Sequence, residues 1–506
     1  MKGVIAAGHQ LTAEAGARVL REGGNAVDAA VAAVLMSWVC EPLLTGPGAG
    51  GFMLVHTPAG EDVLLDFFVA APGKGSDRGS GELKPFEVAF TDDAIQTFHA
   101  GPASCGVYGS PKGVAIALER YGTLSLADLV EGPARVAREG HAITAIQGYL
   151  VDILSPILLS TSEGADLFAP GGNLLETGDH LRMPELADLL DRLGREGPGF
   201  AYDGDVAAAI SDWVLERGGL ITPQDLADYE LIDREPARAT YRGRDILTNP
   251  PPSSGGILIA YSLDLLGRVA RPGDLRALVE VMDQTNKVRT DDFVTALHSQ
   301  GYLERFMAKD ALASVAGQLE SRLGSTTHIS VMDADGCCVA VTCSNGSSSG
   351  VIVPGTGIHL NNMLGEEDLN PSGHRHERGA RVPSMMAPTV VLHEDGRPEI
   401  ALGSAGSNRI RSAIVQTILN IVDFNMKAAE AVDLPRLHLE RGIVDAEPGV
   451  DPEALEQLER SGWTVQRWQE RNLYFGGAQA VARDPASGEL SGGGDPRRGG
   501  AAVVVA

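Results

Sequence analysis

The stretch GSTTHISVMDADG, residues 324–336, decides how this chain of 506 residues is interpreted. A pair of threonines opens the alternating run 328–332, and the Asp335-Gly336 pair that follows is typical of a tight turn. The pattern therefore predicts a strand that begins at Thr326. Two interpretations of that threonine are open. It is either an ordinary strand residue or the point at which the chain cuts itself and makes a new N-terminus.

A threonine that leads a strand gains catalytic chemistry only if the chain is cut before it. Its hydroxyl is a weak nucleophile until a base removes the proton. A free α-amine, with an ordinary pKa of about 7.7 to 8, suits that task near neutral pH. The hydroxyl of Thr326 can create such an amine by attacking the carbonyl of Ser325. The small residues Gly324 and Ser325 leave room for the strained turn that this attack requires.

Composition and charge exclude several classes of partner. The chain has 41 basic and 67 acidic residues, a net charge of −26 and a pI near 4.8. Such a surface repels phosphate backbones and anionic membranes, so we expect neither nucleic acid nor membrane as a partner. The longest apolar stretch, 26–40, contains Asp28 and predicts a buried helix, not a membrane span.

The cysteines and the missing metal motifs bound the compartment and the cofactors. Five cysteines without framework spacing indicate reduced thiols, and no export signal opens the chain, so we expect a cytoplasmic protein. The sequence contains no CxxC pair and no HExxH motif, so we expect no metal site and no cofactor.

The pattern along the chain predicts a mixed α/β protein. Thr12 opens a helix that ends at Gly23-Gly24, and Asn25 caps the next helix. The glycine-rich stretch 43–52 lacks the Gly-Lys-Ser/Thr of a phosphate loop, so a tight turn before a strand is favoured. Further expected elements are helical regions at 125–233 and 257–315, hairpins at 327–343 and 389–402, a helix at 409–424 and a helix from 452.

Seven motifs occur in a fixed order: GNAVDAAVAA, PLLTGPGAGGF, STTHISVMDADG, NNMLGEEDLNP, PSMMAPTVVL, GSAGSNRI and GGGDPRRGG. Together they resemble the gamma-glutamyltranspeptidase family of N-terminal nucleophile hydrolases, over nearly the whole chain. The resemblance implies a four-layer αββα sandwich formed by two subunits that are cut from one precursor. Residues 1–325 would form the large subunit and residues 326–506 the small one, and the two would pair. A homodimer of this heterodimer is left open.

The resemblance also implies the roles of particular residues. Thr326 would be both the processing residue and the nucleophile, and the bond cut would join Ser325 to Thr326. Ser344 matches a second hydroxyl on the neighbouring strand, which supports the nucleophile. The backbone N–H groups of Gly406 and Ser407 match the oxyanion hole. Residues implied to face the substrate are Asn345, with an ambiguity of one residue, Glu366, with an uncertain register, and Ser384. On an alternating strand His328 shares a face with Thr326, and structural support is favoured over base catalysis.

Two positions depart from the family pattern. Glutathione-cleaving members carry an arginine that holds the glutamyl α-carboxylate, and the matching position here is Phe68. A phenyl ring cannot replace a bidentate guanidinium–carboxylate pair. The family's second serine in Ser-Ser-Met is Met385. The stretch 374–381, HRHERGAR, is either a substitute anion site or a solvated loop.

These residues predict an autoprocessing amidohydrolase or acyltransferase that acts on a small-molecule amide or peptide. The first hypothesis is a γ-glutamyl, glutathione-like amide cleaved through an acyl-enzyme on Thr326. The alternative keeps the chemistry but takes another acyl group, of the oxamate, oxalyl, glutaryl or cephalosporin type. A third alternative, of another class, is an unprocessed binding protein without catalysis.

Overall fold

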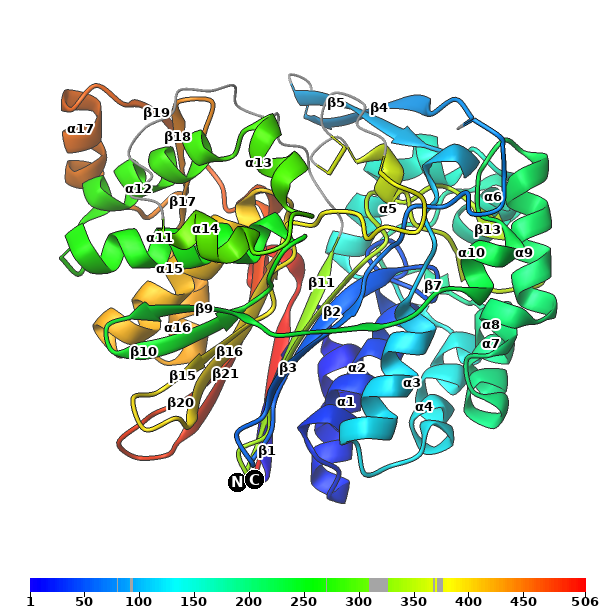
Figure 1. The fold of residues 1–506 in the computed structure, drawn as a ribbon, viewed down its shortest axis with the longest axis horizontal. Helices are drawn as coiled ribbons and strands as arrows, with labels where there is room; N and C mark the ends of the chain where they lie inside the picture. The colour runs from blue at the N-terminus through cyan, green and yellow to red at the C-terminus, as the bar shows by residue number, and fades with distance from the viewer. Residues whose placement is uncertain (80, 92–93, 270, 309–325, 367–368, 371–375) are drawn as a thin grey trace.

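The computed structural model describes residues 1–79, 81–91, 94–269, 271–308, 326–366, 369–370 and 376–506. Two antiparallel sheets lie face to face, and helices cover the outer face of each sheet (Figure 1). The layers follow the order helix, sheet, sheet, helix. The αββα sandwich predicted from the sequence is therefore confirmed.

The first sheet has its strands in the order β22-β1-β11-β12-β2-β3-β8, and each neighbouring pair is antiparallel. Strand β1 lies between two strands from the other half of the chain, which brings the N- and C-terminal ends together (Figure 1). The bounds are β1 Gly3–Ala7, β2 Gly50–His56, β3 Asp62–Phe67, β8 Ile232–Arg234, β11 Thr327–Asp333, β12 Cys338–Ser344 and β22 Ala501–Val505.

The second sheet is β21-β20-β16-β15-β10-β9, also antiparallel throughout. It packs against the first sheet mainly through β16 and β20, which contact β11. A Cβ atom added to Gly403 would lie 2.3 Å from the His328 ring, so glycine permits this close approach of the two sheets. The bounds are β9 Ala237–Tyr241, β10 Arg244–Thr248, β15 Thr389–Leu392, β16 Pro398–Ala405, β20 Gly477–Arg483 and β21 Leu490–Gly494.

Each sheet carries its own layer of helices. The first sheet is covered by α1 Gln10–Glu22, α2 Ala26–Cys40 and α3 Ser110–Tyr121, with α4 Leu126–Glu139, α7 Pro184–Glu196, α8 Phe200–Asp203 and α9 Asp205–Glu216 outside them. The second is covered by α11 Ser254–Val269, α12 Leu275–Val288, α15 Arg409–Phe424 and α16 Ala428–Asp433.

Shorter elements complete the chain. The remaining helices are α5 Ala145–Leu158, α6 Ser162–Phe168, α10 Pro223–Ala227, α13 Asp291–Ala296, α14 Tyr302–Ala308 and α17 Pro452–Arg460. The remaining strands form small separate sheets: β4 Lys84–Thr91 with β5 Ala94–Ala100, β6 His141–Ala142 with β7 His180–Leu181, β13 Ile352–Val353 with β14 Ile358–His359, and β17 Leu437–Glu440 with β18 Ile443–Ala446 and β19 Thr464–Arg467.

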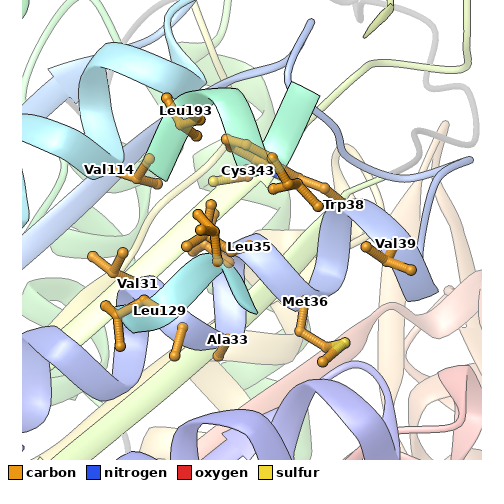
Figure 2. Close-up of a cluster of buried hydrophobic side chains, with 14 of the residues drawn as sticks. Val31, Ala33, Leu35, Met36, Trp38, Val39, Val114, Leu129, Leu193 and Cys343 are labelled. Atoms are coloured by element: carbon orange, nitrogen blue, oxygen red, sulfur yellow. The ribbon is translucent and has the colours of Figure 1, made fainter. Parts of the chain in front are cut away.

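Helix α2 is the centre of the first hydrophobic core. Every residue of α2 is buried, as expected for a helix that is apolar on all sides. Figure 2 shows its side chains Leu35 and Trp38 among Val114 of α3, Leu129 of α4 and Cys343 of β12. The central helix thus joins the outer helices to the strand that runs beside β11.

Capping fixes where α2 begins. The Asn25 side chain accepts hydrogen bonds from the amides of Val27 and Asp28, and the Asp28 carboxylate accepts from the amide of Asn25. This capping box satisfies amides that the first turn of a helix leaves unpaired. Asp28 also accepts hydrogen bonds from the amides of Thr123 and Leu124 and from the Thr123 hydroxyl. One carboxylate therefore ties α2 to the segment before α4.

The element boundaries mostly follow the sequence. Helix α15 and strand β15 have the predicted bounds, whereas α1 begins two residues before Thr12 because His9 caps it. Strand β11 begins at Thr327, one residue after the prediction. The predicted helical region 125–233 also contains three short strands, β6, β7 and β8. The end of the region 257–315 lies outside the described residues.

Two further features concern the cysteines and the length of the apolar helices. All five cysteines are buried and unpaired, and burial raises the pKa of Cys343 far above its usual value, as expected of packing residues. Among the described residues, no helix combines the length and the apolar character that a membrane crossing needs.

We expect Asp28→Ala to lower the free energy of unfolding by about 1–3 kcal/mol, because it leaves four partly buried donors without this acceptor. Chemical denaturation monitored by circular dichroism measures this change. The control is Asp212→Ala, since Asp212 is exposed on α9 and its loss should change stability by less than about 0.5 kcal/mol. Equal effects of the two substitutions would contradict the role assigned to Asp28.

Candidate active site

Thr326 stands directly before β11, beside a second hydroxyl. The β11–β12 register pairs Thr327 with Cys343 and His328 with Thr342, which brings Thr326 next to Ser344. The Thr326 hydroxyl donates a hydrogen bond of 3.3 Å to the Ser344 oxygen, and the Gly346 amide donates one of 2.9 Å to the same oxygen. The nucleophile candidate and its predicted support group are therefore in contact.

His328 lies on the same face of β11 but is bound to other groups. Its two ring nitrogens lie 2.7 Å from the Thr342 hydroxyl and 2.8 Å from the Ser330 hydroxyl. Burial lowers the pKa of His328 to about 3, so the ring is neutral at ordinary pH. These contacts support the structural role favoured by the sequence, because they occupy both nitrogens with neighbouring hydroxyls.

The turn between β16 and α15 has an unusual backbone. Gly406 and Ser407 have φ angles of 118° and 51°, both in the left-handed region. A Cβ atom added to Gly406 would lie 3.0 Å from the Cα atom of Gly476, so only glycine fits there. Ser407 faces the same cleft as Thr326, at the N-terminal end of α15, where the helix dipole favours negative charge.

Thr326 and Ser407 open onto a cleft of about 380 Å³. Most of its wall is apolar, and Glu366 is the one ionisable side chain among its described residues. Glu366 accepts hydrogen bonds of 2.7 Å from both the amide and the hydroxyl of Ser347. The cleft is lined by Phe68, Thr326, Ser344, Gly346, Met363, Glu366, Leu369, Ser384, Met385, Met386, Ser407 and Ile410.

Ser384 lies on the wall of the cleft and is held in place by a neighbouring turn. Its hydroxyl accepts a hydrogen bond of 3.0 Å from the Met386 amide. Its carbonyl accepts from the hydroxyls of Ser253 and Ser254, which lie where the proline-rich turn passes into α11. That turn therefore positions part of the cleft.

Asn345 is placed differently from the other candidates. Its side chain is buried, does not line the cleft, and has no hydrogen-bond partner among the described residues. Its neighbour Gly346 lines the cleft instead, within the one-residue ambiguity of the sequence match. The structure thus brings together Thr326, Ser344, Ser407, Glu366 and Ser384, whereas Ser325 lies outside the described residues.

Phe68, which stands where the family pattern has an arginine, lies in an apolar part of the cleft wall. Phe68 stacks on Phe52 with ring centroids 5.1 Å apart and faces the cleft. The nearby cation Arg381 does not line the cleft. It contacts Asp66 at 3.2 Å and lies over the Tyr229 ring at 4.6 Å. Among the described residues, no cation lines this cleft, and residues 374 and 375 lie outside them.

Glu41 is a buried polar residue that the sequence did not single out. Its carboxyl accepts hydrogen bonds from the hydroxyls of Thr327, at 2.6 Å, and Thr12, at 2.8 Å. Burial raises its pKa to about 7. The residue after the candidate nucleophile is therefore fixed by a group 286 positions away in the chain, with no local pattern to reveal it.

Comparison with known proteins agrees with this geometry. The family model described as Gamma-glutamyltranspeptidase matches residues 12–505. The chain belongs to the gamma-glutamyltranspeptidase family. The Acylase ACY 1 proenzyme of Pseudomonas sp. strain SE83 is 32% identical, and the alignment covers 100% of this chain and 94% of the relative. The Glutathione hydrolase proenzyme of Escherichia coli strain K12 is 30% identical, with 98% and 90% covered.

A solved structure shows the same architecture. The cephalosporin acylase from Bacillus halodurans superposes with a TM-score of 0.81 at 26% identity, covering 99% of this chain and 95% of that one. Membership of this family makes the protein an enzyme of the N-terminal nucleophile hydrolase type, as the sequence predicted.

We expect Ser344→Ala to lower kcat roughly tenfold, because the substitution removes one hydrogen bond to the candidate nucleophile Thr326. Ser407→Ala should change kcat less than about twofold if only the backbone N–H acts, whereas Gly406→Ala should be more damaging because of its strained φ. Steady-state kinetics on correctly folded variants measure all three. An effect of Ser407→Ala as large as that of Gly406→Ala would refute a hole made of backbone groups.

We expect Glu41 to make stability depend on pH. Its folded pKa of about 7 exceeds its ordinary value of 4.5, so between these pH values the folded state binds more protons than the unfolded state. Stability relative to Glu41→Gln should therefore fall as pH rises through this window, by on the order of 3 kcal/mol. Urea titrations at pH 4.5, 6 and 7.5 test this, with exposed Glu22→Gln as the control. A difference that stays constant with pH would contradict it.

Proposed function

We propose that this enzyme is an autoprocessing amidohydrolase or acyltransferase with Thr326 as its nucleophile. The observation that carries the proposal is the Thr326–Ser344 hydroxyl pair at the start of β11, which opens onto the cleft that Ser407 also lines. Attack of the Thr326 hydroxyl on an amide carbonyl would form an ester and release the amine. Water or an amine acceptor would then remove the acyl group.

The proposed base is the α-amine of Thr326 itself, released when the bond from Ser325 is cut. Its ordinary pKa is near neutral pH, whereas the neighbouring His328 is held neutral and engaged by two hydroxyls. The N–H groups of Gly406 and Ser407 would hold the oxyanion. On this scheme residues 1–325 and 326–506 become the two subunits, and the word proenzyme in the names of both relatives supports it.

The wall of the cleft favours an acyl group without an α-carboxylate. Phe68 and Met385 are apolar where a carboxylate would need a cation, and a carboxylate beside them would lose its hydration without compensation. We therefore place the preferred substrate among amides of short or partly apolar acyl groups. The name of the cephalosporin acylase from Bacillus halodurans is compatible with this choice.

A γ-glutamyl amide remains the second candidate because of Glu366. Its carboxylate faces the cleft and can meet the α-ammonium of a glutamyl group. The Escherichia coli relative named glutathione hydrolase supports this candidate as well.

The cytoplasmic location inferred from the sequence stays a prediction, which cell fractionation with an antibody against the protein can test.

We expect the purified enzyme to separate into residues 1–325 and 326–506 under denaturing conditions. Thr326→Ala should remain whole and inactive, because it removes the hydroxyl needed for both reactions. Thr326→Ser keeps a hydroxyl and should still be cut, more slowly, since serine lacks the methyl group that restricts χ1. Intact-mass spectrometry resolves these species. An uncut Ser325–Thr326 bond in active enzyme would rule out the scheme and favour the unprocessed alternative.

We expect kcat/KM for a γ-glutamyl amide to exceed that of the 4-aminobutyryl amide, which lacks only the α-carboxylate, by less than about a hundredfold, or 2.7 kcal/mol. Phe68→Arg should raise this preference for γ-glutamyl, because it supplies the missing cation. Glu366→Gln should slow the γ-glutamyl amide more than the glutaryl amide, which keeps the carboxylate but lacks the α-ammonium. Measuring these three substrates and an oxalyl amide at one pH decides between acyl groups. A preference of wild-type enzyme above a hundredfold would restore glutathione-type substrates.

A further inference from the structure

A second cavity lies beside the first sheet, between α5 and the turn that follows α2. It holds about 600 Å³, counting space open to solvent, and shares no lining residue with the acyl cleft. Its walls come from both sides of the proposed cut. They are formed by Gly8, His9, Glu41, Pro42, Leu43, Leu44, Ile143, Ile146, Gln147, Leu150, Val151, Phe168, Leu181, Leu473 and Arg498.

The cation on this wall, Arg498, has no ion pair within the part of the chain that the structure describes. The adjacent Arg497 contacts Glu447 at 2.7 Å and Asp495 at 3.1 Å, and Arg436 contacts Asp495 at 2.7 Å. The carboxylates of Glu447 and Asp495 are therefore already paired with Arg497 and Arg436. Arg498 is 9% exposed, and among the described residues its Nε and Nη2 atoms have no hydrogen-bond acceptor. Its pKa is lowered only to about 10, mainly by burial, so it stays charged at neutral pH.

A second unused donor lies on the same wall. His9 Nδ1 accepts a hydrogen bond of 3.1 Å from the Leu11 amide, so in the neutral ring the proton belongs on Nε2. That Nε2 atom is buried and has no partner among the described residues. Burial and the neighbouring His141 lower the pKa of His9 to about 4, which keeps the ring neutral.

The acceptors of the lining side chains are already engaged. Both carboxyl oxygens of Glu41 accept from threonine hydroxyls, and Oε1 of Gln147 accepts from the amide and hydroxyl of Thr144. The unsatisfied side-chain atoms of this lining are therefore donors, one of them charged. Apart from these donors and the engaged Glu41 and Gln147, the lining is apolar. Such an inventory is complementary to an acceptor with a negative charge on an apolar body.

We propose that this cavity binds a small monocarboxylate with an apolar body, such as a medium-chain or arylalkanoic acid. The carboxylate would pair with Arg498 and remove the cost of a buried, unpaired guanidinium. The apolar body would lie along Leu150, Val151 and Phe168 and bury its surface there. The cavity shares no lining residue with the acyl cleft, but Glu41 adjoins Thr327 and Arg498 adjoins Gly406, so the two sites lie close together. The proposal does not require the acyl group to be known.

Calorimetric titration of the purified enzyme with octanoate at pH 7 tests the proposal. Saturable binding of one octanoate per enzyme is expected, with octanamide at least tenfold weaker because it lacks the charge. Arg498→Met should weaken octanoate at least tenfold, whereas the exposed Arg135→Met should leave it unchanged. Leu150→Trp, which fills the cavity and leaves Arg498 in the chain, should abolish binding and keeps the test informative if Arg498→Met does not fold.

Kinetics separate this site from the acyl cleft. Octanoate bound in the cavity should not compete with the amide substrate, and Glu366→Gln should leave its affinity unchanged. The proposal is overturned if octanoate does not saturate, if octanamide binds as tightly, or if Leu150→Trp binds octanoate like the wild-type enzyme. Purely competitive inhibition with no loss in Arg498→Met would assign the octanoate to the acyl cleft instead. None of these outcomes depends on whether Thr326 is the nucleophile.

Discussion

The register of β11 between β1 and β12 is the constraint on which the site depends. Side chains alternate along a strand, so Ile329 and Val331 enter the helix-side core while His328 and Ser330 enter the space between the sheets. A slip of one residue would exchange these faces and turn Thr326 away from Ser344. The hydrogen bonds of His328 to Thr342 and Ser330, and of Ser330 to the Gln479 carbonyl of the other sheet, hold the register in place.

Local chemistry made much of the fold predictable, and long-range contacts account for what the sequence could not give. The Asn25 cap, the bounds of α15 and the hairpin after Thr326 depend on residues close together in the chain. The resemblance to a family supplied the four layers and the candidates that meet in the cleft. Glu41 could not be found this way, because its partner Thr327 is distant in sequence, and neither could the exchange of Asn345 for Gly346 at the cleft wall.

A polar network beside Phe68 holds the backbone at this part of the cleft wall. The Asp66 carboxylate forms ion pairs with Arg234 at 2.7 Å and Arg381 at 3.2 Å. It also accepts a hydrogen bond of 2.9 Å from the Phe68 amide. The backbone at this position is therefore held by a neighbouring ion network instead of by contacts of the side chain at residue 68. One substitution can therefore change the cleft wall there, since the groups that fix the strand are separate from the side chain that lines the cleft.

The sheet order β22-β1-β11 affects how the protein would unfold and refold after the proposed cut. Strand β1 would belong to one polypeptide, whereas both of its neighbours, β11 and β22, would belong to the other. Neither piece alone would contain all the strands of this sheet. A single chain finds these pairings at a rate independent of its concentration, but two separated pieces must first collide. The cut would therefore make unfolding irreversible. The native state would persist because its barrier to unfolding is high, and once unfolded, the two pieces would lack the covalent link through which the chain first folded.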